Sequence, residues 1–474
     1  MSAPEPADGG AGRGWMTDAE IDDYPVGPTG GAGAPALARA AAAMGATGQW
    51  GPGQAMGRRW PVGCVALEIT QRCNLDCSLC YLSEHAEAVH DVPLAELFRR
   101  IDTIAATYGP DTDVQVTGGD PTLRDRAELV AIVRRIAARG MRPSLFTNGI
   151  RATRSLLSEL AAAGLVDVAF HVDMTQARRG FDSEVALNAV RADYIDRARG
   201  LGLAVMFNTT VFTGNMHEIP AVARFFVRHA DAVELASFQL QADTGRGVLR
   251  GRDAVVSQPS VMAAIERGAG GPLSFDVLSG GHAACNRYAA ALVADGRAFD
   301  LFDDRDFILE IFTRSAGDAF PRGDRGRFVR DLLAWLARRP GLWPRTAAWA
   351  GRKLWQMRRE LLAARGRVGK ISFFVHNFMD ACRLERERVD ACVFMVATDE
   401  GPVSMCLHNA RRDRHVLKRL KVPTANGNGY WDPLTGSIGD GETTAPRPAP
   451  LPARRRKGRR KQPMASGAPA KDRL

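Results

Sequence analysis

One segment joins an apolar run to three cysteines: Glu68-Ile-Thr-Gln-Arg-Cys73-Asn-Leu-Asp-Cys77-Ser-Leu-Cys80-Tyr81. It begins within an apolar run that has the length and composition of a buried strand. Its cysteines follow the spacing Cys-x3-Cys-x2-Cys on one short loop. Three thiolates this close in the sequence can bind three irons of a [4Fe–4S] cluster and leave the fourth iron open. The competing interpretations are zinc, which usually takes two paired ligand sets, and unliganded thiols. No second cysteine pair with the usual zinc spacing occurs, which favours the cluster.

Outward from this loop, short apolar runs alternate with amphipathic stretches as far as about residue 241. We expect strands at Cys64–Thr70, Asp113–Thr117, Pro143–Thr147, Val166–Asp173, Ala204–Val211 and Ala232–Gln239. We expect helices at Leu94–Tyr108, Arg124–Arg139, Thr153–Ala163, Glu184–Gly200 and His217–His229. Strands separated by helices predict a parallel sheet with crossover helices, which is either open or closed into a barrel.

The cysteine loop after the first strand resembles the signature of the radical S-adenosylmethionine (SAM) superfamily. The resemblance covers roughly residues 60–245 and implies an α/β fold, a partial (βα)6 TIM-like barrel, in agreement with the six expected strands. The family's motif often has an aromatic residue just before the last cysteine. Here Leu79 stands at that position and Tyr81 follows, a departure that concerns the adenine contact.

Further motifs resemble the same family. Thr117-Gly118-Gly119-Asp120-Pro121 ends the second strand and is similar to the family's Gly-Gly-Glu-Pro motif, with Asp120 in place of Glu. Glycines at a strand edge allow backbone carbonyls to approach the methionine ammonium; the alternative is a plain Gly-rich turn. Phe146-Thr147-Asn148-Gly149 resembles another family loop, or is an ordinary Asn-Gly turn.

The resemblance implies a reaction and its cofactors. A [4Fe–4S] cluster on Cys73, Cys77 and Cys80 binds SAM and, reduced by a one-electron donor such as flavodoxin or ferredoxin, cleaves it to methionine and a 5′-deoxyadenosyl radical. That radical abstracts hydrogen from an unactivated carbon. The cofactor-binding candidates are Tyr81, Gly118, Gly119, Asp120, Pro121, His171, Asp173 and Asn208, and Gln239 is a similar candidate. Alternation places His171 and Asp173 on one face of the fourth strand, where a structural pair is the alternative.

Four more cysteines lie beyond the expected sheet: Cys285, Cys382, Cys392 and Cys406. Four thiolates that meet in space would ligate a second [4Fe–4S] cluster, and the alternative is that some are ordinary buried residues. Cys285-Asn-Arg-Tyr288 and the segment from Cys392 to Cys406 resemble the branch of the superfamily that includes archaeal tetraether lipid synthases. Those enzymes join hydrocarbon chains of membrane lipids and carry additional iron sites. This sequence lacks the branch's full cysteine complement.

Composition divides the 474-residue chain, 45% of it apolar, into four regions. We expect a disordered region at 1–55, the partial barrel at 60–245, a mostly helical, Cys-containing extension at 246–440 and a disordered basic tail at 443–474. From residue 445 to the end, ten Arg and Lys stand against the single Asp472, a net +9. The formal total is +10, so about +1 is left for the rest. Only the tail suits nucleic acid, and no specific nucleic acid is expected.

The window 325–368 interleaves Trp and Leu with Arg and Lys and contains four of the eight tryptophans. Pro340 and Pro344 predict a break into two helices. Basic helices with Trp and Leu on the other face lie well at a membrane interface; the alternative is an amphipathic pair packed on the barrel. The tail would add attraction to anionic lipid. With no signal peptide or membrane-spanning run evident, we expect a cytoplasmic protein, peripheral at the inner membrane face if the window binds lipid.

Three functions follow from these features. The leading hypothesis is a radical SAM enzyme that acts on an unactivated carbon of a lipid or isoprenoid chain. The second is a radical SAM enzyme that matures a peptide, although such relatives usually pack their C-terminal cysteines more closely. The third is a non-catalytic iron–sulfur sensor that binds nucleic acid through the tail. The Gly-Gly-Asp-Pro strand end argues against the sensor, which needs no open iron and no ammonium site.

Overall fold

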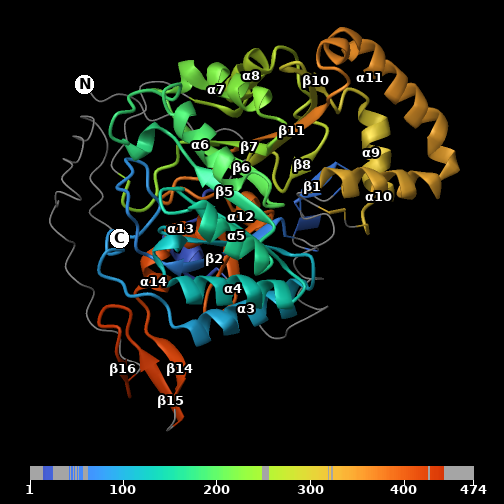
Figure 1. Ribbon diagram of the computed structural model, residues 1–474. Helices are drawn as coiled ribbons and strands as arrows, with labels where there is room; N and C mark the ends of the chain where they lie inside the picture. The colour runs from blue at the N-terminus through green and yellow to red at the C-terminus, as the bar shows by residue number, and fades with distance from the viewer. Residues whose placement is uncertain are drawn as a thin grey trace, which may run out of the picture.

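A mixed sheet of eleven strands is the centre of the protein, with the strand order β10-β9-β11-β7-β6-β5-β4-β3-β2-β12-β13 (Figure 1). The order has two ends, so the sheet is open. The computed structural model describes residues 14–24, 42, 44–45, 47–48, 51, 53–56, 62–247, 256–318, 320–321, 324–424 and 427–441.

Six parallel strands, each hydrogen-bonded to the next in sequence, form the middle of the sheet. They are β2 (Cys64–Thr70), β3 (Asp113–Gly118), β4 (Arg142–Thr147), β5 (Asp167–His171), β6 (Ala204–Val211) and β7 (Val233–Leu240). The crossover helices are α3 (Leu94–Tyr108), α4 (Arg126–Ala138), α5 (Arg154–Ala162), α6 (Asn188–Ala198) and α7 (Ile219–Arg228). The expected α/β arrangement is confirmed, with bounds that differ from the expected ones by a few residues.

Apolar spacing explains these elements. Every residue of β2 is buried, as expected for a strand that is covered on both faces. In α3 the buried apolar residues Leu97, Ile101, Ile104 and Tyr108 recur at helical spacing. They join the main core together with β2, β3 and α4. The carboxyl ends of six parallel strands are thereby held at one edge of the sheet.

The C-terminal extension adds strands to both sides of the six, which the expectation of a mostly helical extension did not include. β11 (Gly369–His376) lies parallel to β7, followed by the antiparallel strands β9 (Asn286–Ala294) and β10 (Arg297–Asp300). On the other side, β12 (Phe394–Ala397) lies parallel to β2 and pairs with the antiparallel β13 (Pro402–Ser404). The physical reason is that β2 and β7 would otherwise present unpaired backbone groups.

Side chains connect the two flanks of the sheet. Phe374 and His376 of β11 contact Phe394 of β12, with ring centroids 6.1 and 4.6 Å apart. Strands β11 and β12 are separated by six others in the strand order, so the sheet must curl for these rings to meet. The curl gives the sheet a barrel-like shape without hydrogen-bonded closure.

The remaining helices belong to the extension. They are α8 (Gln258–Ala269), α9 (Arg305–Arg314), α10 (Arg325–Ala337), η4 (Pro340–Leu342), α11 (Trp343–Ala363), α12 (Arg386–Asp390), α13 (Met405–Ala410) and α14 (Arg412–Val416). Helices α9, α10 and α11 project from one side of the molecule (Figure 1). The turn η4 separates α10 from α11, which confirms the break expected at Pro340 and Pro344. In the described part of the chain, no helix is both long and apolar enough to cross a membrane.

Two small sheets complete the secondary structure. β1 (Gln54–Met56) pairs with β8 (Ser279–Gly280). A three-stranded sheet near the described C-terminal end contains β14 (Leu420–Thr424), β15 (Gly427–Trp431) and β16 (Ile438–Gly439).

Residues 14–24 lie within the region expected to be disordered, yet they are folded. A capping box between Thr17 and Glu20 starts α1 (Asp18–Asp22). Met16 and Ile21 are buried in a small core with Leu384 and other residues of the extension. Tyr24 packs against the same core, and the Met16 amide donates to the Leu384 carbonyl at 2.8 Å, so apolar and polar contacts together attach this segment. The expected disorder of the tail at 443–474 lies outside the described residues.

Candidate functional site

The cysteine loop begins where β2 ends, at the carboxyl edge of the sheet. Cys73, Cys77 and Cys80 are partly buried and are not in disulfide bonds. Burial raises the pKa of Cys77, and its neighbours Cys80, Asp173 and Cys73 raise it further, so the three thiols lie close enough to influence one another. No three His, Cys, Asp or Glu side chains of the described residues could hold a single metal ion. The ligands of a four-iron cluster bind different irons, and three neighbouring thiols are the donor set that such a cluster takes.

Two glycines hold the end of β3 against the start of this loop. The amides of Gly119 and Asp120 donate to the carbonyls of Thr70 and Arg72, both at 2.8 Å. Gly118 has φ +126°, and a Cβ there would lie 2.0 Å from the Thr70 carbonyl oxygen; at Gly119 it would lie 2.0 Å from that of Arg72. Only glycine permits this approach. In the structure, the glycine pair therefore positions the entry to the cysteine loop.

Asp120 joins the ends of β3 and β4. Its fully buried carboxylate accepts hydrogen bonds from the amides of Thr122 at 3.0 Å and Asn148 at 2.9 Å, and from the Thr147 hydroxyl at 2.9 Å. Pro121 begins the short helix η1 (Pro121–Leu123), for which Asp120 is the N-cap. Both carboxylate oxygens are thus taken by donors of the chain, which fits a positioning role better than contact with a ligand.

Tyr81 links the cysteine loop to the glycine turn. Its hydroxyl donates to the Gly118 carbonyl at 2.6 Å. The guanidinium of Arg412 lies 4.7 Å from the centre of the Tyr81 ring, and its Nη1 donates to both carboxylate oxygens of Glu68, at 2.8 and 2.9 Å. Burial raises the pKa of Tyr81, so the hydroxyl stays a donor. Sequence reasoning missed both Glu68 and Arg412, although a charged residue inside an otherwise apolar strand was a signal.

Arg246 covers the last cysteine from the loop after β7. Its Nε donates to the Cys80 sulfur at 3.3 Å, and the amide of Gly247 donates to the Cys80 carbonyl at 2.9 Å. Burial lowers the pKa of Arg246, but the thiols of Cys80 and Cys73 outweigh that effect and leave the pKa raised. Arg246 was also missed, because nothing in its local sequence marks it.

Polar residues cluster at the ends of β5 and β6. His171 Nε2 lies 2.6 Å from Asp173 Oδ2, which also accepts the amide of Thr210 at 2.8 Å. Burial alone would lower the pKa of His171, but the Asp173 carboxylate leaves it raised; the same pairing and hydrogen bonds hold the pKa of Asp173 well below its usual range despite burial. β5 ends at His171, so Asp173 is not the strand residue that we expected but the cap of η2 (Met174–Gln176). Asn208 is buried and pairs in register with His171.

The loop after β4 also contacts the cysteine loop. Asn148 Nδ2 donates to the Asn74 side-chain oxygen at 2.6 Å and lies 4.0 Å from the Cys73 sulfur. The structure therefore gathers the cysteine loop, the glycine turn, the Asn148 loop and the His171–Asp173 pair at one edge of the sheet. Gln239 lies on β7, two strands from His171, and pairs in register with Thr210 of β6.

Comparison with known proteins agrees with this arrangement. Residues 67–226 match the family model of the Radical SAM superfamily. The chain carries a radical SAM domain. Radical SAM enzymes use a [4Fe–4S] cluster and SAM, the two cofactors that the sequence led us to expect.

Curated relatives of the domain include enzymes with different substrates. The chain is 26% identical to a 7,8-dihydro-6-hydroxymethylpterin dimethyltransferase of Methanocaldococcus jannaschii, over 38% of this chain and 36% of that protein. It is 31% identical to a PqqA peptide cyclase of Methylobacterium sp. (strain 4-46), over 38% of this chain and 47% of that protein. The chain thus aligns with less than half of the length of each of these relatives. The resemblance of the C-terminal pieces to tetraether lipid synthases stays a prediction.

Solved structures show partial similarity. Streptococcus suis SuiB aligns with 40% of this chain and 42% of its own, at 12% identity and a TM-score of 0.33. The protein anSMEcpe with bound AdoMet aligns with 43% of this chain and 57% of its own, at 14% identity and a TM-score of 0.34.

Beyond the radical SAM domain, three of the four C-terminal cysteines lie near one another. Arg388 Nε donates to the Cys285 sulfur at 3.2 Å. Burial raises the pKa of Cys285 to about 11. Burial also raises the pKa of Cys406, and Cys392 and Cys285 raise it further. Cys382 is exposed. The structure thus brings together Cys285, Cys392 and Cys406 and places Cys382 at the surface.

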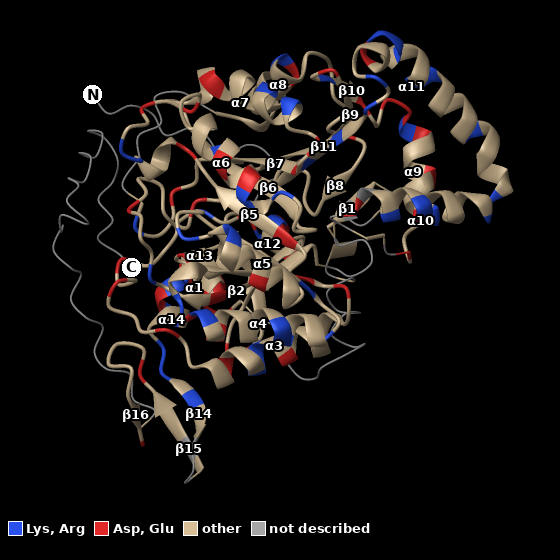
Figure 2. Cartoon of the chain, in the orientation of Figure 1, with Lys and Arg blue, Asp and Glu red and all other residues tan. Residues whose placement is uncertain are grey.

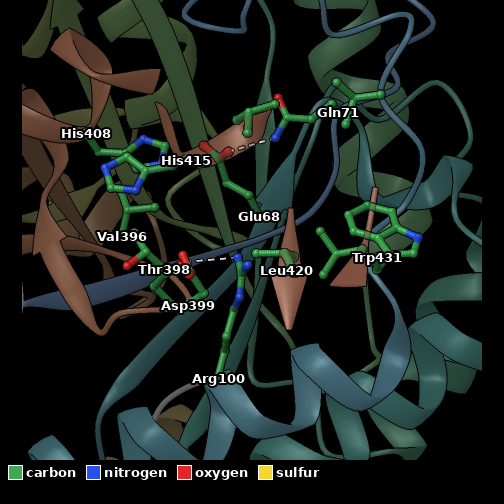
Figure 3. Close-up of a pocket in the computed structure, with 14 residues that line it drawn as sticks. Glu68, Gln71, Arg100, Val396, Thr398, Asp399, His408, His415, Leu420 and Trp431 are labelled. Atoms are coloured by element: carbon green, nitrogen blue, oxygen red, sulfur yellow. Dashed lines mark hydrogen bonds between the residues drawn. The ribbon is translucent and has the colours of Figure 1, made fainter. Parts of the chain in front are cut away.

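A partly open pocket of about 30 Å³ lies where the radical SAM domain meets α13 and α14 (Figure 3). Glu68, Gln71 and Arg100 line it from the domain, opposite the stacked rings of His408 and His415, whose centroids are 5.0 Å apart. Gln71 Oε1, His408 Nδ1 and His415 Nε2 are buried there and form no hydrogen bond with any of the described residues. The pocket suits one or two waters and is too small for SAM.

Proposed function

We propose that Cys73, Cys77 and Cys80 hold a [4Fe–4S] cluster at which the chain cleaves SAM reductively. The radical formed abstracts hydrogen from an unactivated carbon. The observation that supports this most strongly is the position of the three thiols on one loop at the carboxyl edge of the parallel sheet, against the Gly118–Gly119 turn. When bound and reduced by an external donor such as flavodoxin or ferredoxin, the cluster supplies the electron for cleavage.

The surrounding residues prepare this edge. Asp120 fixes the glycine turn, so that Gly118 and Gly119 hold the end of β3 against the cysteine loop, where their carbonyls would be available to the SAM ammonium. Tyr81 packs beside the last cysteine and positions the same turn. The polar groups of His171, Asp173 and Asn208 are available to SAM or substrate from the neighbouring strands.

The test is iron and sulfide content after anaerobic purification, with 5′-deoxyadenosine release measured on the same sample. Replacing Cys73, Cys77 and Cys80 with Ala should remove about four irons and abolish release. The matched control is Cys64→Ala, which removes a cysteine of β2 outside the loop and should change neither quantity. Well-folded protein without iron and without 5′-deoxyadenosine would contradict the proposal, and iron without 5′-deoxyadenosine would favour the sensor hypothesis.

We further propose a second cluster on the C-terminal cysteines. Cys285, Cys392 and Cys406 supply three thiols, and Cys382 is the fourth candidate although it lies at the surface. The expected result is about eight irons per chain, falling to about four in Cys392→Ala. If the iron content of Cys382→Ala is unchanged, the second cluster has three cysteine ligands. If the iron content falls, Cys382 is the fourth ligand. About four irons in wild type, all lost with the loop triad, would leave these cysteines structural.

For the substrate, we propose a hydrocarbon chain of a lipid or isoprenoid. The support is the pair of exposed amphipathic helices α10 and α11 beside the domain. The second candidate is a peptide, which the PqqA peptide cyclases among the relatives favour. Lipid extract should stimulate 5′-deoxyadenosine release, and mass spectrometry should find a modified chain. Stimulation by peptides alone would replace the first candidate with the second.

A further inference from the structure

The helices α10 and α11 expose large apolar side chains that the domain does not cover. On α11, Leu354, Trp355 and Leu362 are 62%, 68% and 82% exposed. Trp355 and Leu362 lie on the helix face opposite Lys353, Met357 and the C-cap residue Ala364, which are buried, and Leu354 lies at the side between the two faces. On α10, Leu333 is 59% exposed. An ordinary surface helix places its apolar stripe on the core, whereas α11 has apolar residues on both faces.

The inner face of α11 is firmly attached. Met357 and Ala364 pack with Leu292 and Phe299 of the β9–β10 hairpin. The ammonium of Lys353 is held by Asp303 and by the Asp300 carbonyl. The exposed apolar side chains are therefore carried on a fixed helix and are not the result of a detached segment.

The same helices carry a concentrated positive charge. Residues 325–368 contain twelve Lys and Arg and two acids, a net +10. With +9 on residues 445–474 and a formal total of +10, the other 400 residues carry −9. Basic residues recur along α11 and α10 (Figure 2). By sequence, the segment of α10 and α11 is thus strongly basic, whereas the rest of the chain before the tail is acidic in sum.

The combination of exposed apolar side chains and positive charge on α10 and α11 distinguishes between the possible binding partners of these helices. Nucleic acid would satisfy the arginines but would leave Leu354, Trp355 and Leu362 in water. A second copy of the chain would bring two basic segments together, and the charges that acids at the neighbouring helix α9 do not neutralise would repel each other. An anionic bilayer satisfies both features, because acyl chains accept the apolar side chains while lipid phosphates neutralise the arginines. Arg358 stacks on the Trp355 ring at 4.0 Å, so a positive charge and an apolar ring occupy one spot.

We propose that α10 and α11 dock the protein on the surface of an anionic lipid bilayer. Docking does not depend on the radical chemistry. The probe is flotation of the full chain with phosphatidylcholine vesicles, with or without phosphatidylglycerol, without SAM or reductant. Binding is expected only with phosphatidylglycerol, and it should weaken in high salt.

Two sets of variants separate the apolar and the charged contributions. Leu354→Ser, Trp355→Ser and Leu362→Ser together should weaken vesicle binding by about tenfold or more. Arg330→Gln, Arg338→Gln and Arg359→Gln should each weaken it by about fivefold. The matched control replaces three exposed arginines of other helices, Arg134, Arg224 and Arg267, with Gln, and it should change binding far less. All of these side chains are exposed, so the thermal melting temperature should be unchanged.

Three results would overturn the proposal. One is the absence of binding by folded wild-type protein to phosphatidylglycerol vesicles. Another is binding that disappears when Arg454, Arg455, Arg456 and Lys457 of the tail become Gln but survives the α11 variants. The last is that the α11 variants abolish RNA binding or self-association and leave flotation unchanged. None of these results bears on 5′-deoxyadenosine release, so docking and catalysis fail separately.

Discussion

Replacing Arg412 with Met should destabilise the protein by about 3–5 kcal/mol, because it removes the partner of a buried carboxylate. The side chains of Arg412 and Glu68 are 4% and 8% exposed. At the observed separation near 3 Å and an effective dielectric constant of about 20, the attraction is about 5–6 kcal/mol. Gln71 still donates to Glu68 at 2.9 Å in the variant and offsets part of the loss.

Urea unfolding monitored by tryptophan fluorescence measures this change. The double variant Glu68→Gln, Arg412→Met removes both charges and should recover most of the loss, since neither partner is left buried alone. Arg134→Met is the control on an exposed arginine and should stay within about 0.5 kcal/mol of wild type. A loss below about 1 kcal/mol in Arg412→Met, or a double variant no more stable than the single one, would refute the reasoning.

Three further predictions concern the site and its supports. Gly118→Ala should lower the free energy of unfolding by at least about 1–3 kcal/mol from its positive φ alone. It should also lower the iron content, because the added Cβ displaces Thr70. Urea unfolding and iron analysis check this, and Gly200→Ala, also at positive φ but in open space, is the control. Arg246→Met removes the hydrogen bond to the Cys80 sulfur and should make the cluster's reduction potential more negative. Arg246→Lys should retain part of the wild-type potential. A redox titration that finds the same potential in Arg246→Met as in wild type would contradict this role of Arg246. Burial lowers the pKa of His376 to about 3. Below about pH 6.5 the unfolded chain therefore binds a proton at this residue that the folded chain does not bind. The free energy of unfolding should fall by about 2–3 kcal/mol from pH 7 to pH 4.5. His376→Phe, which keeps a ring against Phe394, should remove that part of the acid sensitivity, and equal urea midpoint shifts in both proteins would be evidence against it.

The sequence predicted the part of the fold whose pattern is local. Strand β2 and helix α3 have the expected bounds, because apolar alternation and helical spacing are readable within a single segment. Strands β11 and β12 were not predicted as part of the sheet. They are short apolar runs far along the chain from the strands they pair with, and what makes them strands is the free edges of β7 and β2.

The same distinction applies to the site. The cysteine spacing and the glycine pair were recognisable because each occupies a few consecutive residues. The residues that support them were not, because Arg246 and Cys80 are 166 positions apart and Arg412 and Glu68 are 344 apart. A buried strand that contains Glu68 does signal a partner, but it does not indicate which of the many arginines it is.

The pairing of β12 with β2 has a consequence for how the protein is made. Val396 of β12 pairs with Ala66 of β2, so this edge of β2 has its partner strand only after about 330 more residues have been synthesised. At about 5–20 residues per second, a ribosome needs roughly 15–65 seconds to synthesise that interval. Throughout that time the cysteine loop follows a strand, β2, that has one unpaired edge. Assembly of the iron centre is therefore expected to follow the synthesis of β12, and chaperones that shield strand edges would be needed earlier than the iron donors.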